Sequence, residues 1–194
     1  MGDTIRTFVA FDLPDDIIDH AARLQAKLQA HGLKLRWVRP QNLHLTLKFL
    51  GDIPRQEATA VGQALQQASR GTPPLQLTVQ GLSAFPGIKR PRVLWIGVGG
   101  QVDLVQALYR KLEDQLSDLG FAREKRGFTA HLTLGRFKAG WPVNNLLSAV
   151  EELGGYDPKP FLARRVVLYQ SDLRPQGAVY TSLNDVWLDS VDIR

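Results

Sequence analysis

The chain contains no cysteine, and only four of its 194 residues are histidine. The absence of cysteine excludes a disulfide framework, a thiol nucleophile and a Cys-type zinc site. No stretch approaches the roughly 20 apolar residues of a membrane-spanning helix, and the N-terminal residues are polar, without the apolar core of a signal peptide. We therefore expect a soluble cytoplasmic protein that does not associate with membranes.

Several catalytic signatures are also missing. The sequence has no G-x-x-x-x-G-K-[ST] phosphate loop and no G-x-S-x-G elbow, which argues against a P-loop enzyme and against a serine hydrolase of that type. With 44% hydrophobic residues the chain can bury a real core, either as one large domain or as two small lobes. Its net charge of +5 and pI of about 9.7 are compatible with a polyanionic partner such as nucleic acid.

The tetrapeptide His-Leu-Thr-Leu occurs twice, at His44–Leu47 and at His131–Leu134, 87 residues apart. In an extended strand, side chains alternate between the two faces, so His and Thr would share one face, roughly 7 Å apart. Both Leu residues would point into a core. Each copy therefore offers one proton-transfer group and one hydroxyl donor from a strand that is anchored by its apolar side.

The repetition extends beyond the tetrapeptides and indicates an internal duplication. Each half reads strand–helix–strand–helix–strand, with approximate halves 6–88 and 93–183 separated by a Pro/Gly/basic loop over residues 86–92. Phe8 in the first expected strand corresponds to Trp95, and Gly32 at the end of the first helix corresponds to Gly120. The predicted helices cover residues 15–29, 55–69, 102–119 and 142–153, and further strands cover 75–79 and 165–169.

Two histidines and two threonines suit acid–base chemistry on a phosphate ester. The unperturbed pKa of histidine, about 6.5, lets one ring accept a proton from a nucleophile while the other gives a proton to the leaving group. Threonine hydroxyls can donate to the non-bridging oxygens. A zinc site would need three or four ligands, and neither motif contains Asp or Glu. His20 and His31 have no counterpart 87 residues on, and we expect both on the solvent side of the first helix.

A resemblance to a known family rests on the two motifs and on five further segments: Arg6–Pro14, Thr46–Gly51, Arg90–Trp95 and residues 169–171 and 177–181. The chain resembles the two-histidine phosphoesterases, in particular the bacterial and archaeal RNA 2′,3′-cyclic phosphodiesterases, also called 2′-5′ RNA ligases. The resemblance implies an α+β fold of two pseudo-symmetric lobes, with antiparallel sheets lining a central cleft and helices outside. It also implies hydrolysis of a terminal RNA 2′,3′-cyclic phosphate to a 2′-phosphate, without metal or other cofactor and without an obligate protein partner. Ligation of 2′-5′ linkages would be the reverse reaction.

By this resemblance, His44 is the general acid toward O3′ and His131 the general base toward water, while Thr46 and Thr133 hold the phosphate. Because the two halves are nearly equivalent, the sequence itself does not decide which histidine is the acid and which is the base. Arg136 follows the second motif and, by the resemblance, would also hold the phosphate; the alternative is an RNA-facing or solvent arginine. Strict alternation does not place Arg136 on the face of His131, so a bend or bulge after Gly135 would be needed.

Other residues have two open interpretations. Phe11 and Phe49 are either core residues or base-stacking contacts to RNA, and the parity of Phe49 with Leu47 favours the core. Arg90 and Arg92, with Lys89, form a basic loop that contacts RNA backbone or is simply solvated. Trp37 and Arg39, just before the first motif, could flank the cleft.

Two alternative functions remain open at this stage. The same site could act on small substrates such as cyclic nucleotides or a 2′-5′-linked oligonucleotide. A non-catalytic module that holds RNA ends would use the cleft alone, although the intact His/Thr quartet argues against it.

Overall fold

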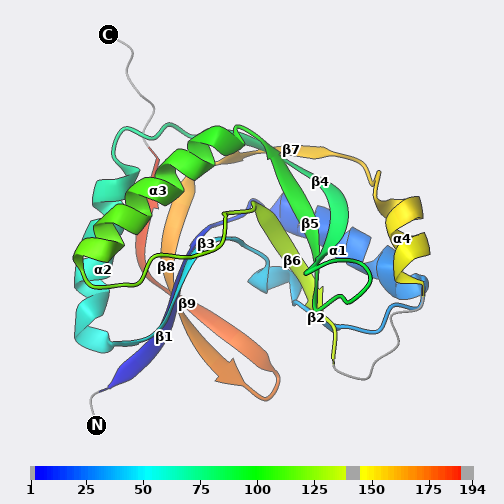
Figure 1. The fold of residues 1–194 in the computed structure, drawn as a ribbon, viewed down its shortest axis with the longest axis horizontal. Coiled ribbons are helices and arrows are strands. Elements are labelled where there is room, and N and C mark those ends of the chain that lie inside the picture. Colours follow the sequence, from blue (N-terminus) through cyan, green and yellow to red (C-terminus); the bar gives the residue numbers. More distant parts are fainter. Residues whose placement is uncertain (1–2, 139–144, 189–194) are drawn as a thin grey trace.

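A computed structural model describes residues 3–138 and 145–188 of the chain (Figure 1). The strands are β1 (Thr4–Phe11), β2 (Arg36–Trp37), β3 (Leu45–Pro54), β4 (Leu75–Phe85), β5 (Val93–Gly100), β6 (His131–Arg136), β7 (Lys159–Ala163), β8 (Arg165–Arg174) and β9 (Gly177–Trp187). The helices are α1 (Asp15–Ala30), α2 (Ala58–Ser69), α3 (Val102–Asp118) and α4 (Leu146–Leu153), with short 3-10 helices η1 (Pro40–Asn42) and η2 (Arg55–Glu57).

All the strands belong to one antiparallel sheet in the order β7-β4-β5-β6-β3-β1-β8-β9, with β2 paired to β6. The centre of this order is the β6–β3 junction, where Leu45 pairs with Leu132, its equivalent 87 residues on. The helices lie outside the curved sheet, with α2 and α3 packed together over one lobe and α1 and α4 over the other (Figure 1). The predicted α+β fold with two pseudo-symmetric lobes is confirmed, although a single continuous sheet replaces separate sheets.

The two lobes in space are not the two halves of the sequence. Strand β4 is encoded in the first half but pairs with β5 of the second half. Strand β8 is encoded in the second half but pairs with β1 of the first. Each half thus contributes a long strand to the lobe of the other half, β4 from the first half and β8 from the second.

The helices form where the apolar spacing predicts them. In α1, Ile17, Ala21, Leu24 and Leu28 are fully buried, at the i, i+4, i+7, i+11 spacing of a single helical face. Both α1 and α3 end in the same way: Gly32 and Gly120 have φ values of +81° and +90°, which favour glycine. In α1 the Leu33 N–H donates to Leu28 O, and in α3 the matching bond runs from Phe121 to Leu116.

Some expected boundaries differ. The second helix is preceded by η2, and helix α4 begins at Leu146, after Asn145 with φ of +68°. The expected start of that helix at 142–144 lies outside the described residues. His20 was expected on the solvent side, but it is only 5% exposed and its ring packs against Tyr156, 4.7 Å between ring centroids. Its burial comes from a segment more than 130 residues away, so the pattern of α1 alone did not reveal it.

Candidate active site

The two motif strands meet at the centre of the sheet. As predicted, the Leu residues of both motifs are buried, whereas His44, Thr46, His131 and Thr133 are only partly buried. The strands are antiparallel with Leu45 opposite Leu132. Continued by one residue in each direction, this register sets His44 across from Thr133 and Thr46 across from His131. The His/Thr quartet is thereby gathered around the pseudo-twofold axis.

Both histidine rings are oriented by the same hydrogen bond. The Nδ1 atom of His44 lies 2.8 Å from Asn42 O, and Nδ1 of His131 lies 2.7 Å from Thr129 O. A carbonyl oxygen can only accept, so Nδ1 carries the hydrogen in both rings. In the neutral form, each Nε2 is therefore an acceptor. The two acceptor carbonyls are also 87 residues apart, so the duplication reproduces the orientation of the ring as well as the residue.

A β-bulge follows each histidine and changes which later residues face the site. In the β1–β3 pairing, Val9 pairs with Lys48 and Ala10 with Thr46, so Leu47 is the extra residue. In the β5–β6 pairing, Leu94 pairs with Gly135 and Trp95 with Thr133, so Leu134 is the extra residue. The two bulges are related by the same offset of 87.

The second bulge returns Arg136 to the face of His131. Arg136 pairs with Val93 on β5, and His131 pairs with Gly97, two residues beyond Trp95 on that strand. Because Val93, Trp95 and Gly97 alternate along β5, their partners share one face of the sheet. A bulge of the kind that this placement of Arg136 needs is therefore present, at Leu134 rather than after Gly135. Arg136 is close enough to lower the pKa of both motif histidines.

The first bulge does the same for Phe49, which corrects the expectation from parity. Phe49 pairs with Phe8, on the face that carries Thr46, and it is 61% exposed. Its ring lies 6.0 Å from that of Phe8. Phe11, in contrast, is fully buried in the core at 0% exposure, so its assignment as an RNA contact is wrong.

Burial determines the electrostatics of both histidines. It lowers the pKa of His44 from 6.5 to about 4, and the neighbouring His131 and Arg136 act in the same direction against the hydrogen bond to Asn42. Burial also lowers the pKa of His131, assisted by Arg136 and opposed by the hydrogen bond to Thr129. With no anion beside them, both rings are neutral near pH 7.

Aromatic rings surround both histidines, and sequence reasoning missed this role. Phe8 lies 4.7 Å from the His44 ring and Tyr180 lies 5.4 Å from it. Around His131, Phe85 and Trp95 lie at 5.0 and 5.8 Å. Phe8 and Trp95 are equivalent by the duplication. This correspondence is the one sequence feature that could have indicated aromatic rings beside both histidines, but by itself it indicates only matching strands.

A cavity of about 320 Å³ opens beside His44. Asn42, Tyr169 and Tyr180 contribute to its wall, and Arg39 lies at it as expected. Trp37 does not line this cavity: it pairs with Gly135 and packs half-buried against the core. Of the basic loop, Arg90 and Arg92 are exposed, and Arg92 directly precedes the Val93–Arg136 pair at the start of β5.

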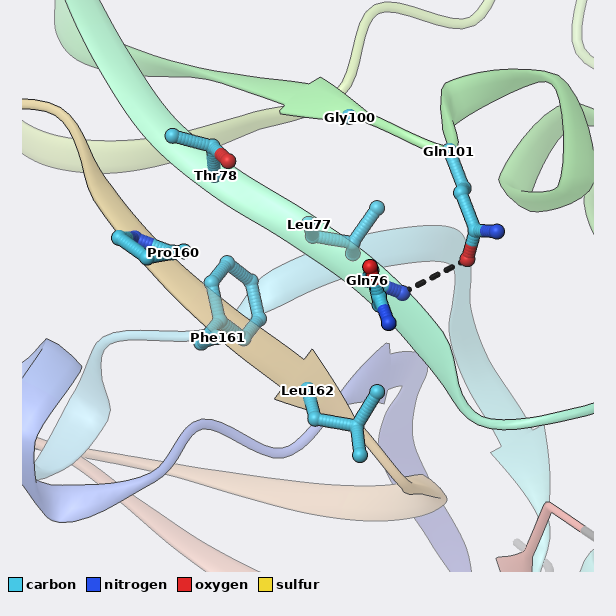
Figure 2. Close-up of a pocket in the computed structure, with 8 residues that line it drawn as sticks. All are labelled: Gln76, Leu77, Thr78, Gly100, Gln101, Pro160, Phe161 and Leu162. Carbon is cyan, nitrogen blue, oxygen red and sulfur yellow. Dashed lines mark hydrogen bonds between the residues drawn. The ribbon is translucent and has the colours of Figure 1, made fainter.

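A second hollow, of about 450 Å³, lies where β4, β5 and β7 meet the start of α3 (Figure 2). Its lining is Gln76, Leu77, Thr78, Gly100, Gln101, Pro160, Phe161 and Leu162. Gln101 Oε1 accepts a hydrogen bond from the Gln76 N–H at 2.8 Å. This lining contains no group that titrates near neutral pH, so the hollow cannot itself supply proton transfer.

Two further findings concern the described part of the chain only. Residues 3–138 and 145–188 contain no group of three or more His, Asp or Glu side chains placed to hold a metal ion. Within the same ranges, no helix is long and apolar enough to cross a membrane.

Comparison with known proteins places this geometry in a family. The family described as LigT like Phosphoesterase matches the chain twice, over residues 11–95 and 96–180. The chain belongs to this family. The predicted membership of the two-histidine phosphoesterases is thereby confirmed, and each matched segment contains one His-Leu-Thr-Leu motif.

Relatives and solved structures agree with this assignment. The chain is 31% identical to an RNA 2′,3′-cyclic phosphodiesterase of Methanothermobacter thermautotrophicus, over 92% of this chain and 96% of that protein. It is 32% identical to one of Thermotoga maritima, over 98% and 99%. Among crystal structures, TT0787 of Thermus thermophilus matches with a TM-score of 0.76 and 26% identity, over 95% and 98% of the two chains. E. coli LigT complexed with 3′-AMP matches with a TM-score of 0.74 and 25% identity, over 97% and 100%.

Proposed function

We propose that this LigT-like phosphoesterase is an RNA 2′,3′-cyclic phosphodiesterase that opens the terminal cyclic phosphate to a 2′-phosphate. The observation that carries the proposal is the pair of Nδ1–carbonyl hydrogen bonds at His44 and His131. They leave two Nε2 atoms, one from each motif strand, to act on opposite sides of one phosphorus. Water attack and departure of O3′ require one proton acceptor and one proton donor in that arrangement.

His44 is assigned as the acid toward O3′ and His131 as the base toward water. The protein alone would leave His44 neutral, with a pKa of about 4. A phosphodiester carries a negative charge, and an opposite charge beside a buried imidazole favours the protonated form. In this proposal the negative charge of the bound substrate therefore raises the pKa of His44 and keeps its ring protonated.

The phosphate is held by groups that face the same side of the sheet. Thr46 and Thr133 lie across the junction from His131 and His44, where their hydroxyls can donate to the non-bridging oxygens. Arg136 brings a guanidinium to this face through its bulge, and a guanidinium can donate two parallel hydrogen bonds to phosphate. These donors would stabilise the charge that develops as water attacks.

The side of His44 is the side of the terminal nucleoside, because O3′ belongs to its ribose. The cavity of about 320 Å³ beside His44 supplies room, with Tyr169 and Tyr180 in its wall. Phe49 presents an exposed ring on the same face, suited to stack on a base of the RNA. Arg90 and Arg92 are proposed to contact the RNA backbone.

Ligation of 2′-5′ linkages would use the same groups with a different nucleophile. A 5′-hydroxyl of a second RNA in the position of water would attack the cyclic phosphate, with proton transfer by the same two histidines. The product would be a 2′-5′ linkage, so ligation needs no additional residue.

The test is incubation of the purified protein with an oligonucleotide that ends in a 2′,3′-cyclic phosphate, with EDTA present and the product position identified. We expect a 2′-phosphate, and a loss of about 10²- to 10⁴-fold in rate for His44→Ala and for His131→Ala. His31→Ala is the matched control, since His31 lies at the end of α1 near Glu152, away from the quartet. Near-wild-type turnover in either motif variant would refute the proposal.

Two outcomes would redirect it. Faster turnover of a cyclic mononucleotide than of the oligonucleotide would favour the small-substrate alternative. RNA binding without turnover would favour a module that holds RNA ends.

A further inference from the structure

Two buried polar contacts lie behind the His/Thr quartet, on the core side of the sheet. The first is made by Gln25 of α1, which is 4% exposed. Its Nε2 donates to Val38 O at 2.8 Å and to Leu134 O at 2.9 Å. Val38 lies in the segment that leads into His44, and Leu134 lies on the strand that begins with His131. Gln25 therefore connects the segment that precedes His44 to the strand that begins with His131.

The second contact is made by Lys48 of β3 and Glu113 of α3, whose side chains are 8% and 6% exposed. Lys48 Nζ lies 2.6 Å from Glu113 Oε1 and donates to Ala122 O at 2.8 Å. Glu113 Oε2 accepts a hydrogen bond from the Glu124 N–H at 2.8 Å. Ala122 and Glu124 lie in the segment that leads into His131, and Lys48 lies on the strand that follows His44.

The two contacts are equivalent under the duplication. Gln25 and Glu113 are 88 residues apart, the same offset as the helix-ending glycines Gly32 and Gly120. Gln25 holds the segment before His44 against β6, which carries the second motif. Glu113 holds the segment before His131 against β3, which carries the first motif. One contact is neutral and the other is an ion pair, so the duplication has kept the arrangement while the chemistry has changed.

The location of these contacts gives them their significance. The lobes are joined between β3 and β6 by a single registered pair, Leu45 with Leu132. A junction this short does little by itself to fix the separation of two strands. A buried ion pair is in general weak evidence for added stability, because desolvation of the charges offsets their attraction. The Lys48–Glu113 pair instead holds β3 at a fixed distance from the segment that leads into His131.

We propose that Gln25 and the Lys48–Glu113 pair are positioning residues that fix the separation and orientation of His44 and His131 across the β3–β6 junction. This inference rests on the proposed function, because it supposes that both rings act on one phosphorus. None of the three side chains touches the substrate face. They act through the backbone that presents the two histidines.

The experiment uses four full-length variants: Gln25→Met, Lys48→Met, the double variant Lys48→Met/Glu113→Leu, and the control Leu65→Ala. Leu65 is fully buried in α2, outside both contacts, so its truncation lowers stability without touching the junction. Lys48→Met leaves Glu113 buried and unpaired, and so lowers both stability and rate. The double variant replaces the whole pair with apolar side chains and is expected to fold about as stably as wild type.

We expect kcat to fall roughly 10- to 100-fold in the double variant and in Gln25→Met, with KM within about two-fold, because a misplaced catalytic group loses rate without losing binding. Leu65→Ala should lower Tm but leave kcat unchanged at a temperature where it is folded. The imidazole NMR signals of His131 should shift in the double variant, and those of His44 in Gln25→Met. A stable double variant with wild-type kcat and unshifted histidine signals would overturn the inference.

The two proposals fail in distinguishable ways. If wild-type protein does not turn over the cyclic-phosphate oligonucleotide, the proposed function fails, while the histidine signals still report whether the contacts position the rings. If wild type is active and the variants behave like the control, only the positioning role fails.

Discussion

Binding of a phosphate anion between the two histidines should restore the protonation of His44. Without an anion, the pKa of His44 is about 4, so its ring is neutral near pH 7. A proton donor in that state would be almost absent. The assignment of His44 as the acid therefore requires a large change in its pKa when the substrate binds.

The required energy can be compared with what one charge supplies. Returning the pKa from about 4 to the neutral range is a roughly thousandfold change in proton affinity, or about 4 kcal/mol. A single negative charge about 4 Å from the imidazole contributes about 4 kcal/mol at an effective dielectric constant near 20. One phosphate oxygen in contact with Nε2 is thus sufficient.

The measurement is an NMR titration of isotopically labelled histidines, with and without a nucleoside 2′-phosphate as the product ligand. We expect the His44 signal to titrate near neutral pH only when the nucleotide is bound. The chemical shifts of His31, which lies beside Glu152 at the end of α1, should not respond to the nucleotide. If bound nucleotide leaves the pKa of His44 near 4, His44 cannot be the acid, and the roles of the two histidines must be exchanged.

Further predictions concern binding, electrostatics and stability. Phe49→Ala should raise KM for an oligonucleotide about tenfold or more by loss of base stacking, with unchanged unfolding free energy because the ring is 61% exposed. Arg136→Met should raise the pKa of both motif histidines in an NMR titration, because the guanidinium lowers them. Neutral His44 is favoured by folding, so the unfolded chain binds more protons as the pH falls; chemical denaturation should show wild type losing about 3 kcal/mol between pH 6.5 and 4 that His44→Gln retains. Phe11→Ala, at a fully buried site, should cost about 3–5 kcal/mol in the same assay.

The features that depend on local pattern were predictable from the sequence. Alternation placed His44 and Thr46 on one face and their Leu neighbours in the core, and helical spacing located α1 and α3 to within a residue. The offset of 87 indicated that the two motifs belong to one site. Each of these inferences uses residues that are close in sequence, or the identity of two segments.

The features that depend on pairing with a distant strand were not predictable. The bulges at Leu47 and Leu134 arise from the register with β1 and β5, and nothing in the motif itself announces them. Parity therefore favoured the core for Phe49, whereas the register exposes it on the face that carries Thr46. The possible RNA contact at Phe11 was wrong for a related reason. Phe11 lies in a continuous apolar run, in which alternation does not distinguish one face of the strand from the other.

The exchange of β4 and β8 between the lobes bears on how such a molecule can arise. A single repeat, with β1, α1, β3, α2 and β4 alone, would leave β1 without the neighbour that β8 provides, and β4 without β5. Two copies that paired these strands as the present chain does would exchange them, which is the geometry of a domain-swapped homodimer with the His/Thr quartet on the twofold axis. Fusion of the two genes would make that dimer one chain, and would free each histidine to diverge into its own role.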